Sequence, residues 1–280
     1  LNFVTCNNLA NCYKEQSNFE QAWHYYKQAL ELNPEYPEAH FNCSLLQLLE
    51  GRLKDGFSNY EWRWKSAHYV KPLYAEFPLW EGEDFHTKTL LIYAEQGFGD
   101  TLQCIRYLPQ IIPLGGHVCV ECQPELVDLL KAAFPMAYFY SRKDRLPPFD
   151  LQIPLFSLPR IFQTELNTIP AQVPYLFPPP PWEGRIRSRI GITWAGNPHH
   201  KDDFKRSCPF DIFSMLFDVK ALQFYNLQKE TEDLEDKTFD NVSDLSPSLH
   251  TFSETASFIS QLDLIITVDT SIAHLAGALG

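Results

Sequence analysis

Apolar and small residues in the first 66 positions follow the spacing of packed helices, and the pattern recurs about 34 residues later. Ala22 and Tyr26 in the first stretch correspond to Gly56 and Tyr60 in the second, and Pro34 ends a helix between them. The other helix-contact positions of the first stretch are Leu9, Ala10, Tyr13 and Ala29. The pattern predicts pairs of helices that place small residues where the helices touch.

This spacing resembles the tetratricopeptide repeat, with a degenerate second unit over residues 37 to about 66. Such repeats recruit other proteins, so the resemblance implies a protein partner for residues 1–66. The second unit ends with Trp62 and Trp64, and two interpretations of this pair stay open. The commoner arrangement is that such residues seal a repeat against the next domain, and the alternative is a platform on which a carbohydrate stacks.

Short apolar strands alternate with amphipathic helices in the rest of the chain, a pattern typical of a parallel sheet covered on both faces. Strands are predicted at 89–95, 117–122, 137–140, 150–154, 189–196, 222–228 and 263–269. Helices are predicted near 100–112, 124–133, 209–217, 254–261 and 271–279. Six prolines within residues 170–182 predict a semi-rigid linker, because they fit neither a helix nor a central strand.

The predicted fold class is α/β, with two Rossmann-like domains that follow an all-α segment at 1–66. We expect the first domain at 67–177, the linker at 178–188 and the second domain at 189–280. Ligands of open α/β sheets bind outside the carboxyl ends of the strands. The sequence therefore predicts a ligand cleft between the two domains.

The net charge of −12 argues against a nucleic-acid partner, because duplex binding needs a basic face. No apolar run approaches the length of a membrane span, and residues 1–20 lack a signal-peptide pattern, which favours a cytoplasmic location. Seven cysteines, an odd number, suit free thiols. Cys119 and Cys122 form a CxxC within a predicted strand, where they face opposite sides of the sheet, so we expect no metal there.

The first candidate segment for chemistry is EQGFGDTLQ, which follows a predicted strand. Gly97 and Gly99 allow the backbone to turn tightly and to approach a ligand. Asp100 caps the helix that follows, and two interpretations remain: a cap alone, or a cap that also serves catalysis.

The second candidate segment leaves its strand through Gly196 and gathers the densest basic cluster near a predicted strand end. The cluster consists of His199, His200, Lys201, Lys205 and Arg206. A diphosphate suits such a place because charged donors form strong hydrogen bonds to it. The alternative is a solvated loop in which lysine pairs with a neighbouring aspartate.

The third candidate segment is a buried strand that runs into Asp269, Thr270 and Ser271 at a helix start, with His274 one turn later. Free backbone N–H groups and the helix dipole at such a start favour a phosphate. An ordinary helix cap and a buried structural histidine are the alternatives.

Together, EQGFGDTLQ, WAGNPHHKDDFKRS, LQKE and VDTSIAHLAGALG resemble the landmarks of the bacterial family 9 glycosyltransferases, which include the heptosyltransferases. The resemblance runs from about residue 60 to the end and is strongest to the members with preceding tetratricopeptide repeats. It implies a GT-B fold, an inverting mechanism, a nucleotide-diphospho-sugar donor, and no cofactor or obligatory metal. Because that family continues beyond the position of Gly280, we expect the second domain to be incomplete.

The resemblance also implies roles for individual residues. It assigns the general base to Asp100 and the neutralisation of the leaving diphosphate to Lys205 or Arg206. It assigns the holding of that diphosphate to the segment with Asp269, Thr270, Ser271 and His274, although Ser271 stands where the family usually has glycine. Gln228 and Lys229, at the end of a second-domain strand, are expected to contact the nucleotide or ribose.

The expected acceptor is a protein, a peptide or a glycolipid. A second hypothesis is a protein-interaction module whose transferase-like domains have lost their chemistry. A third hypothesis, an NAD-dependent oxidoreductase, is disfavoured because Leu102 occupies the place of the third glycine of the GxGxxG pattern.

Overall fold

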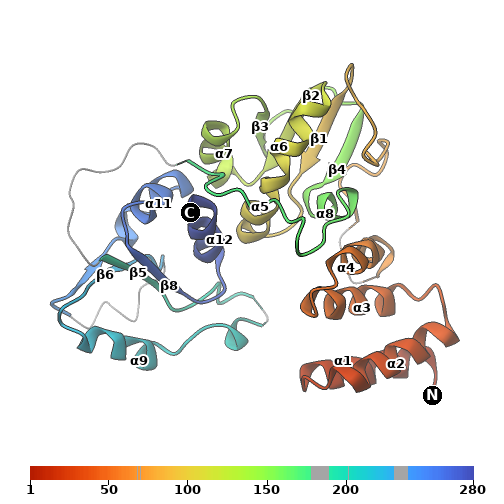
Figure 1. The fold of residues 1–280 in the computed structure, drawn as a ribbon, viewed down its shortest axis with the longest axis horizontal. Helices are drawn as coiled ribbons and strands as arrows, with labels where there is room; N and C mark the ends of the chain where they lie inside the picture. Colours follow the sequence, from red (N-terminus) through yellow and green to blue (C-terminus); the bar gives the residue numbers. More distant parts are fainter. Residues whose placement is uncertain (68, 70, 178–188, 201, 230–238) are drawn as a thin grey trace.

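The computed structural model describes residues 1–67, 69, 71–177, 189–200, 202–229 and 239–280. The linker predicted at 178–188 and the predicted basic residue Lys201 lie outside the described residues. Figure 1 shows a helical N-terminal part beside two separate sheets, with helices α5 and α12 between the sheets.

The N-terminal part is made of two successive helix pairs. Its helices are α1 (Phe3–Glu15), α2 (Phe19–Leu32), α3 (Pro37–Leu49) and α4 (Leu53–Tyr60), followed by the 3-10 turn η1 (Glu61–Lys65). Asn2 and Asn18 cap α1 and α2 through their side chains, and Pro37 starts α3, where its missing N–H costs nothing. The predicted helical pairs are therefore present.

Small residues allow the helices of each pair to approach closely, as the repeat pattern predicts. Ala10, Ala22 and Tyr26 are fully buried between α1 and α2. A Cβ atom added at Gly56 would lie 2.7 Å from Cδ2 of Leu48, so α4 tolerates no side chain where it crosses α3.

The first sheet is parallel, with the order β3-β2-β1-β4. Its strands are β1 (Thr89–Tyr93), β2 (His117–Cys122), β3 (Tyr138–Ser141) and β4 (Leu151–Pro154). The intervening helices and turns are α5 (Phe98–Cys104), η2 (Ile105–Tyr107), α6 (Leu108–Ile111), η3 (Ile112–Leu114), η4 (Pro124–Leu126), α7 (Val127–Ala133), η5 (Leu155–Ser157) and α8 (Leu158–Ile161).

The second sheet repeats this topology, with the order β7-β6-β5-β8 and all pairs parallel. Its strands are β5 (Arg189–Thr193), β6 (Gln223–Asn226), β7 (Val242–Asp244) and β8 (Leu264–Thr267). Its helices and turns are η6 (Asp203–Lys205), α9 (Phe210–Phe213), η7 (Ser214–Asp218), η8 (Ser246–Ser248), α11 (Phe252–Ile259) and α12 (Ser271–Leu279). The predicted α/β class with two Rossmann-like sheets is confirmed.

Two details of the strand prediction were wrong. Strand β7 was missed, because a three-residue edge strand with one apolar side chain carries almost no periodic signal. The strands predicted at 89–95, 189–196, 222–228 and 263–269 end two or three residues earlier. The residues that follow these shortened strands form loops at the carboxyl edges of the two sheets.

Helix α12 packs into the apolar core of the first sheet, whereas β5 and β6 of the second sheet also have a separate core with Ile192, Trp194 and Phe224. The buried residues Leu275 and Ala278 of α12 belong to the same cluster as Leu102 and Ile105 of the first sheet's helices. The carbonyl of Ala278 also accepts hydrogen bonds from the backbone N–H groups of Tyr175 and Leu176, at 3.0 and 3.2 Å. The end of α12 is therefore tied to the segment that follows α8.

Candidate active site

A cavity of ≈ 1230 Å³ lies between the carboxyl ends of the two sheets. Its lining comes from three parts of the chain: the end of the helical N-terminal part with the residues that follow it, the segments after β1 to β3, and the segments after β5 to β8. All three candidate segments from the sequence reach it. This is the position that the strand order predicts for a ligand.

Asp100 both caps α5 and lines the cavity. Its Oδ2 accepts a hydrogen bond from the backbone N–H of Gly97 at 3.0 Å, which closes a capping arrangement at the helix start. Burial raises the pKa of this carboxyl, while the Gly97 N–H and His274 oppose the shift. The two interpretations of Asp100 are thus compatible, because the capping carboxylate is itself part of the cavity wall.

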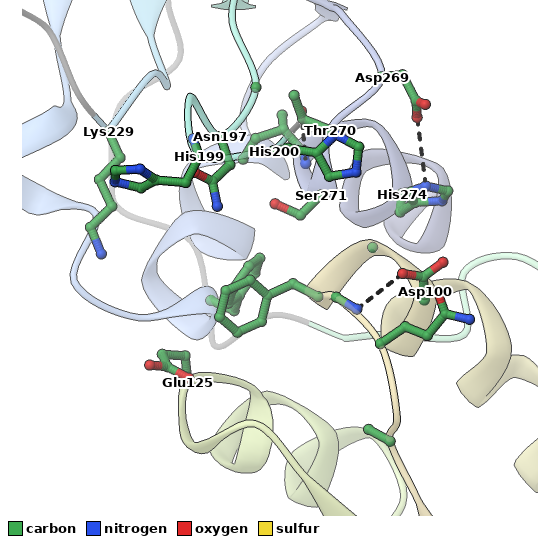
Figure 2. Close-up of a pocket in the computed structure, with 18 of the residues that line it drawn as sticks. Asp100, Glu125, Asn197, His199, His200, Lys229, Asp269, Thr270, Ser271 and His274 are labelled. Atoms are coloured by element: carbon green, nitrogen blue, oxygen red, sulfur yellow. Dashed lines mark hydrogen bonds and ion pairs between the residues drawn. The ribbon is translucent and has the colours of Figure 1, made fainter. Parts of the chain in front are cut away.

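His274 approaches the start of α5 because residue 99 is glycine. A Cβ atom at Gly99 would lie 2.6 Å from Cδ2 of His274. On its other side, Nε2 of His274 lies 4.0 Å from Oδ1 of Asp269. Figure 2 shows His274 between Asp269 and Asp100, so that α12 brings an imidazole to two carboxylates from different sheets.

The start of α12 offers hydroxyl and backbone donors to the cavity. Thr270 caps the helix by accepting a hydrogen bond from the N–H of Ile272 at 3.3 Å. Ser271 is the first residue of the nine-residue helix, and its side chain points toward the cavity (Figure 2). Both residues line the cavity, where the dipole of α12 favours an anion.

Arg206 links the basic loop to the start of α12. Its Nε pairs with Oδ1 of Asp203 at 3.1 Å, and its Nη1 donates to the carbonyl of Asp269 at 3.3 Å. Gly196 leaves room for this guanidinium, because a Cβ atom there would lie 2.7 Å from Nε of Arg206. The cation of Arg206 is therefore placed beside the helix start that carries Thr270.

Lys205, which the resemblance also linked to the diphosphate, is paired with two carboxylates. Its Nζ pairs with Oε2 of Glu15 at the end of α1, at 2.6 Å, and with Oδ1 of Asp202 at 3.3 Å. Lys205 is not among the residues that line the cavity. Neighbouring residues outside a regular strand or helix point in unrelated directions, so sequence spacing alone left Lys205 and Arg206 equivalent.

Gln228 and Lys229 reach the cavity from the end of β6. The Oε1 of Gln228 accepts a hydrogen bond from the N–H of Ala195 at 3.1 Å, so this buried amide ties together the loops after β5 and β6. Lys229 is exposed and lies with His199 and His200 at the second-sheet side of the cavity (Figure 2).

Sequence reasoning missed an ion pair at the opposite side of the cavity. Glu95, directly after β1, pairs with Arg63 of η1 at 3.0 Å, and the Arg63 side chain is completely buried. Burial raises the pKa of Glu95 to about 7, against the opposing effect of Arg63. An acidic residue at the carboxyl end of a strand could have drawn attention to Glu95. Its partner Arg63 lies in the helical segment, and the α/β pattern gives no reason to expect contact between the two.

The two tryptophans of η1 have different surroundings. Trp62 stacks on His40, with ring centroids 3.9 Å apart, so it packs within the helical part. Trp64 lies over Arg63, with 4.1 Å from Cζ to the ring centroid, and contributes to the cavity lining together with Tyr69 and Lys71. Packing therefore describes Trp62, whereas Trp64 takes part in both packing and the cavity.

Within the described residues, no group of three His, Cys, Asp or Glu side chains is arranged to hold a metal ion. Cys119 and Cys122 are free and buried, and burial raises the pKa of Cys122 to about 12. None of the described helices has both the length and the apolarity needed to cross a membrane.

Comparison with known protein families identifies the helical N-terminal part. The family model of the tetratricopeptide repeat matches residues 3–36. These residues cover α1 and α2, so the first repeat predicted from the sequence is confirmed.

Comparison with solved structures identifies the fold of the remainder. The iron-containing dodecameric glycosyltransferase TibC of enterotoxigenic E. coli H10407 is 12% identical, with a TM-score of 0.55 over 70% of this chain and 57% of TibC. TibC in complex with ADP-D-beta-D-heptose gives a TM-score of 0.52. A family 9 glycosyl transferase from Veillonella parvula DSM 2008 is 11% identical, with a TM-score of 0.50 over 72% of this chain and 80% of its own. The two-sheet part of the chain has the GT-B-like fold of family 9 glycosyltransferases.

A curated relative extends along most of the chain. Protein FlbA of Caulobacter vibrioides is 23% identical, over 86% of this chain and 46% of FlbA. The chain therefore spans about half the length of this curated relative.

Proposed function

We propose that this chain belongs to an inverting glycosyltransferase that moves a sugar from a nucleotide-diphospho-sugar to an acceptor hydroxyl. The observation that carries the proposal is the meeting of Asp100, Arg206 and the start of α12 in one cavity between two Rossmann-like sheets. A base and an anion site on opposite walls are what glycosyl transfer needs.

The donor diphosphate lies at the second-sheet wall. Its oxygens accept hydrogen bonds from Arg206 and from the hydroxyl and backbone donors of Thr270 and Ser271. His274, one turn along α12, stands between this anion site and Asp100. Gln228 and Lys229 lie where the loops after β5 and β6 would receive the nucleotide. Lys205 takes no part, because its ammonium group pairs with Glu15.

Asp100 supplies the base. Its carboxylate accepts the proton of the acceptor hydroxyl while that oxygen forms a bond to the anomeric carbon of the sugar. The bond between this carbon and the diphosphate oxygen breaks on the opposite face, which inverts the configuration. The departing negative charge is stabilised by Arg206 and the dipole of α12. Burial of Asp100 supports the role, because a raised pKa brings a carboxylate closer to the basicity that proton abstraction requires.

The likeness to TibC, which has been solved with ADP-D-beta-D-heptose, makes an ADP-sugar the first donor to test. The acceptor, whether a peptide or protein or a glycolipid, enters from the side of Trp64, Tyr69 and Lys71, because the anion site occupies the opposite wall. The tetratricopeptide repeat is a recruitment surface for such an acceptor or for a protein partner.

Release of nucleoside diphosphate from a panel of nucleotide sugars tests the proposal, with water as the acceptor. We expect release from one donor and a loss of about 100-fold or more in Asp100→Asn. No release from any donor would instead support the scaffold hypothesis. Equal release by wild type and Asp100→Asn would exclude Asp100 as the base.

A further inference from the structure

Arg63 connects the repeat segment, residues 1–66, to the catalytic loop. Its side chain has no exposed surface, although a guanidinium is costly to bury unless its donors are paired. It donates to both carboxylate oxygens of Glu95, at 3.1 and 3.3 Å, to Glu61 at 2.7 Å, to Ser157 at 2.8 Å and to the carbonyl of Tyr60 at 3.2 Å. Because the guanidinium of Arg63 has all these partners, it fixes the position of Glu95 relative to η1.

The next residue of the loop is held by two tyrosines. The Nε2 of Gln96 donates to the hydroxyl oxygens of Tyr60, at 2.6 Å, and of Tyr69, at 2.8 Å. Its backbone carbonyl accepts a hydrogen bond from Gln123 at 2.8 Å. Tyr60 is the last residue of α4, so the repeat segment reaches this loop at two consecutive positions.

The third residue of the loop, Gly97, is hydrogen-bonded to Asp100, the proposed base. The N–H of Gly97 donates to Oδ2 of Asp100 at 3.0 Å. Residues 95, 96 and 97 are therefore anchored in succession, the first two by the repeat segment and the third by Asp100. Without these anchors, a glycine-containing loop at a strand end would have many accessible conformations.

We propose that Tyr60 and Arg63 are positioning residues, which hold the turn at 95–97 and thereby the carboxylate of Asp100. The repeat segment is then a working part of the active site rather than a detachable recruitment arm. Trp64, Tyr69 and Lys71 extend the same contact into the cavity lining. The proposal rests on the proposed function for the role of Asp100, but the coupling itself is measurable without activity.

The repeat supplies a matched pair of variants. Tyr60 and Tyr26 occupy corresponding positions of the two units, and both are buried tyrosines with a hydrogen-bonded hydroxyl. Tyr60→Phe removes a bond to the loop, whereas Tyr26→Phe removes only the 2.6 Å bond to Asn11 within the first unit. The double variant R63Q/E95Q removes the ion pair with Glu95, while Glu61, the other carboxylate on Arg63, keeps Arg160 as a cationic partner at 3.9 Å.

Amide hydrogen exchange of the full chain reads out the coupling directly. We expect exchange in residues 95–101 to accelerate by about tenfold in Tyr60→Phe and R63Q/E95Q, and to stay unchanged in Tyr26→Phe. Unchanged exchange in both test variants, or equal acceleration in Tyr26→Phe, would overturn the proposal.

The release of ADP from ADP-D-beta-D-heptose gives the second readout. In Tyr60→Phe, we expect a lower kcat with an unchanged affinity for ADP. The acidic limb of the rate profile should also move to higher pH, because the Gly97 N–H that lowers the pKa of Asp100 is held less firmly. His274 and Asp269, which also act on this pKa, belong to the opposite wall and stay in place. Faster exchange without any release of nucleoside diphosphate from the nucleotide-sugar panel by the wild type would retain the coupling and remove the proposed reaction.

Discussion

His274 of α12 packs against Gly99 of α5, so closely that a Cβ atom at residue 99 would lie 2.6 Å from Cδ2 of the imidazole. Through this contact, α12, whose first turn forms the candidate diphosphate site, packs against α5, which carries Asp100. The two halves of the proposed chemistry therefore depend on a single glycine for their mutual position.

Gly99→Ala tests this dependence. The added methyl group forces the imidazole or α12 to move, and we expect a loss of about 1–3 kcal/mol in the free energy of unfolding. Gly277→Ala is the matched control, because Gly277 has open space around it in α12, and it should stabilise by about 0.5–1 kcal/mol. Urea denaturation measures both. Equal stabilisation by the two changes would show that the Gly99 contact is not tight.

The pH dependence of the reaction follows from Asp100. Because its pKa is raised by burial, the carboxylate loses its charge at a higher pH than an ordinary aspartate does. We expect the rate of diphosphate release to fall as the pH falls through this raised pKa. A pH–rate profile of the wild type provides the measurement, and a profile flat down to the ordinary aspartate range would exclude Asp100 as the base.

Glu95 gives a separate prediction for stability. Its pKa rises from 4.5 to about 7 on folding, so the folded state favours the protonated carboxyl. The stabilisation from this group is complete below pH 4.5 and is lost as the pH rises through about 7. Wild type should therefore lose stability relative to Glu95→Gln across this interval, as measured by thermal unfolding at several pH values. A relative gain by the wild type would mean that attraction to Arg63 outweighs burial.

The hydrophobic pattern predicts the fold well because β1, β2, β4 and β5 are buried on both faces. Strand β2 and helix α12 have the predicted bounds, since each combines a clear apolar period with an abrupt end. The short edge strand β7 was not predicted, because its one apolar residue gives no periodicity.

The candidate site is predictable only in part. A strand end followed by Gly97 and Gly99 pointed to Asp100, and a strand end followed by Asp269 and Thr270 pointed to the start of α12, because sheet topology places carboxyl ends together. Topology says nothing about which of two adjacent loop cations faces inward, so Lys205 and Arg206 were not separable. The pairing of Arg63 with Glu95 depends on how the repeat segment docks against the first sheet, and no local pattern encodes that docking.

Isothermal titration of ADP, UDP and GDP against the full chain tests the central claim most directly, with Arg206→Ala and Lys205→Ala alongside. The account predicts saturable binding of one diphosphate, weakened about 10-fold to 100-fold by Arg206→Ala and less than about threefold by Lys205→Ala. Absence of binding by the wild type, or equal weakening by both substitutions, would contradict a diphosphate site between Arg206 and the start of α12.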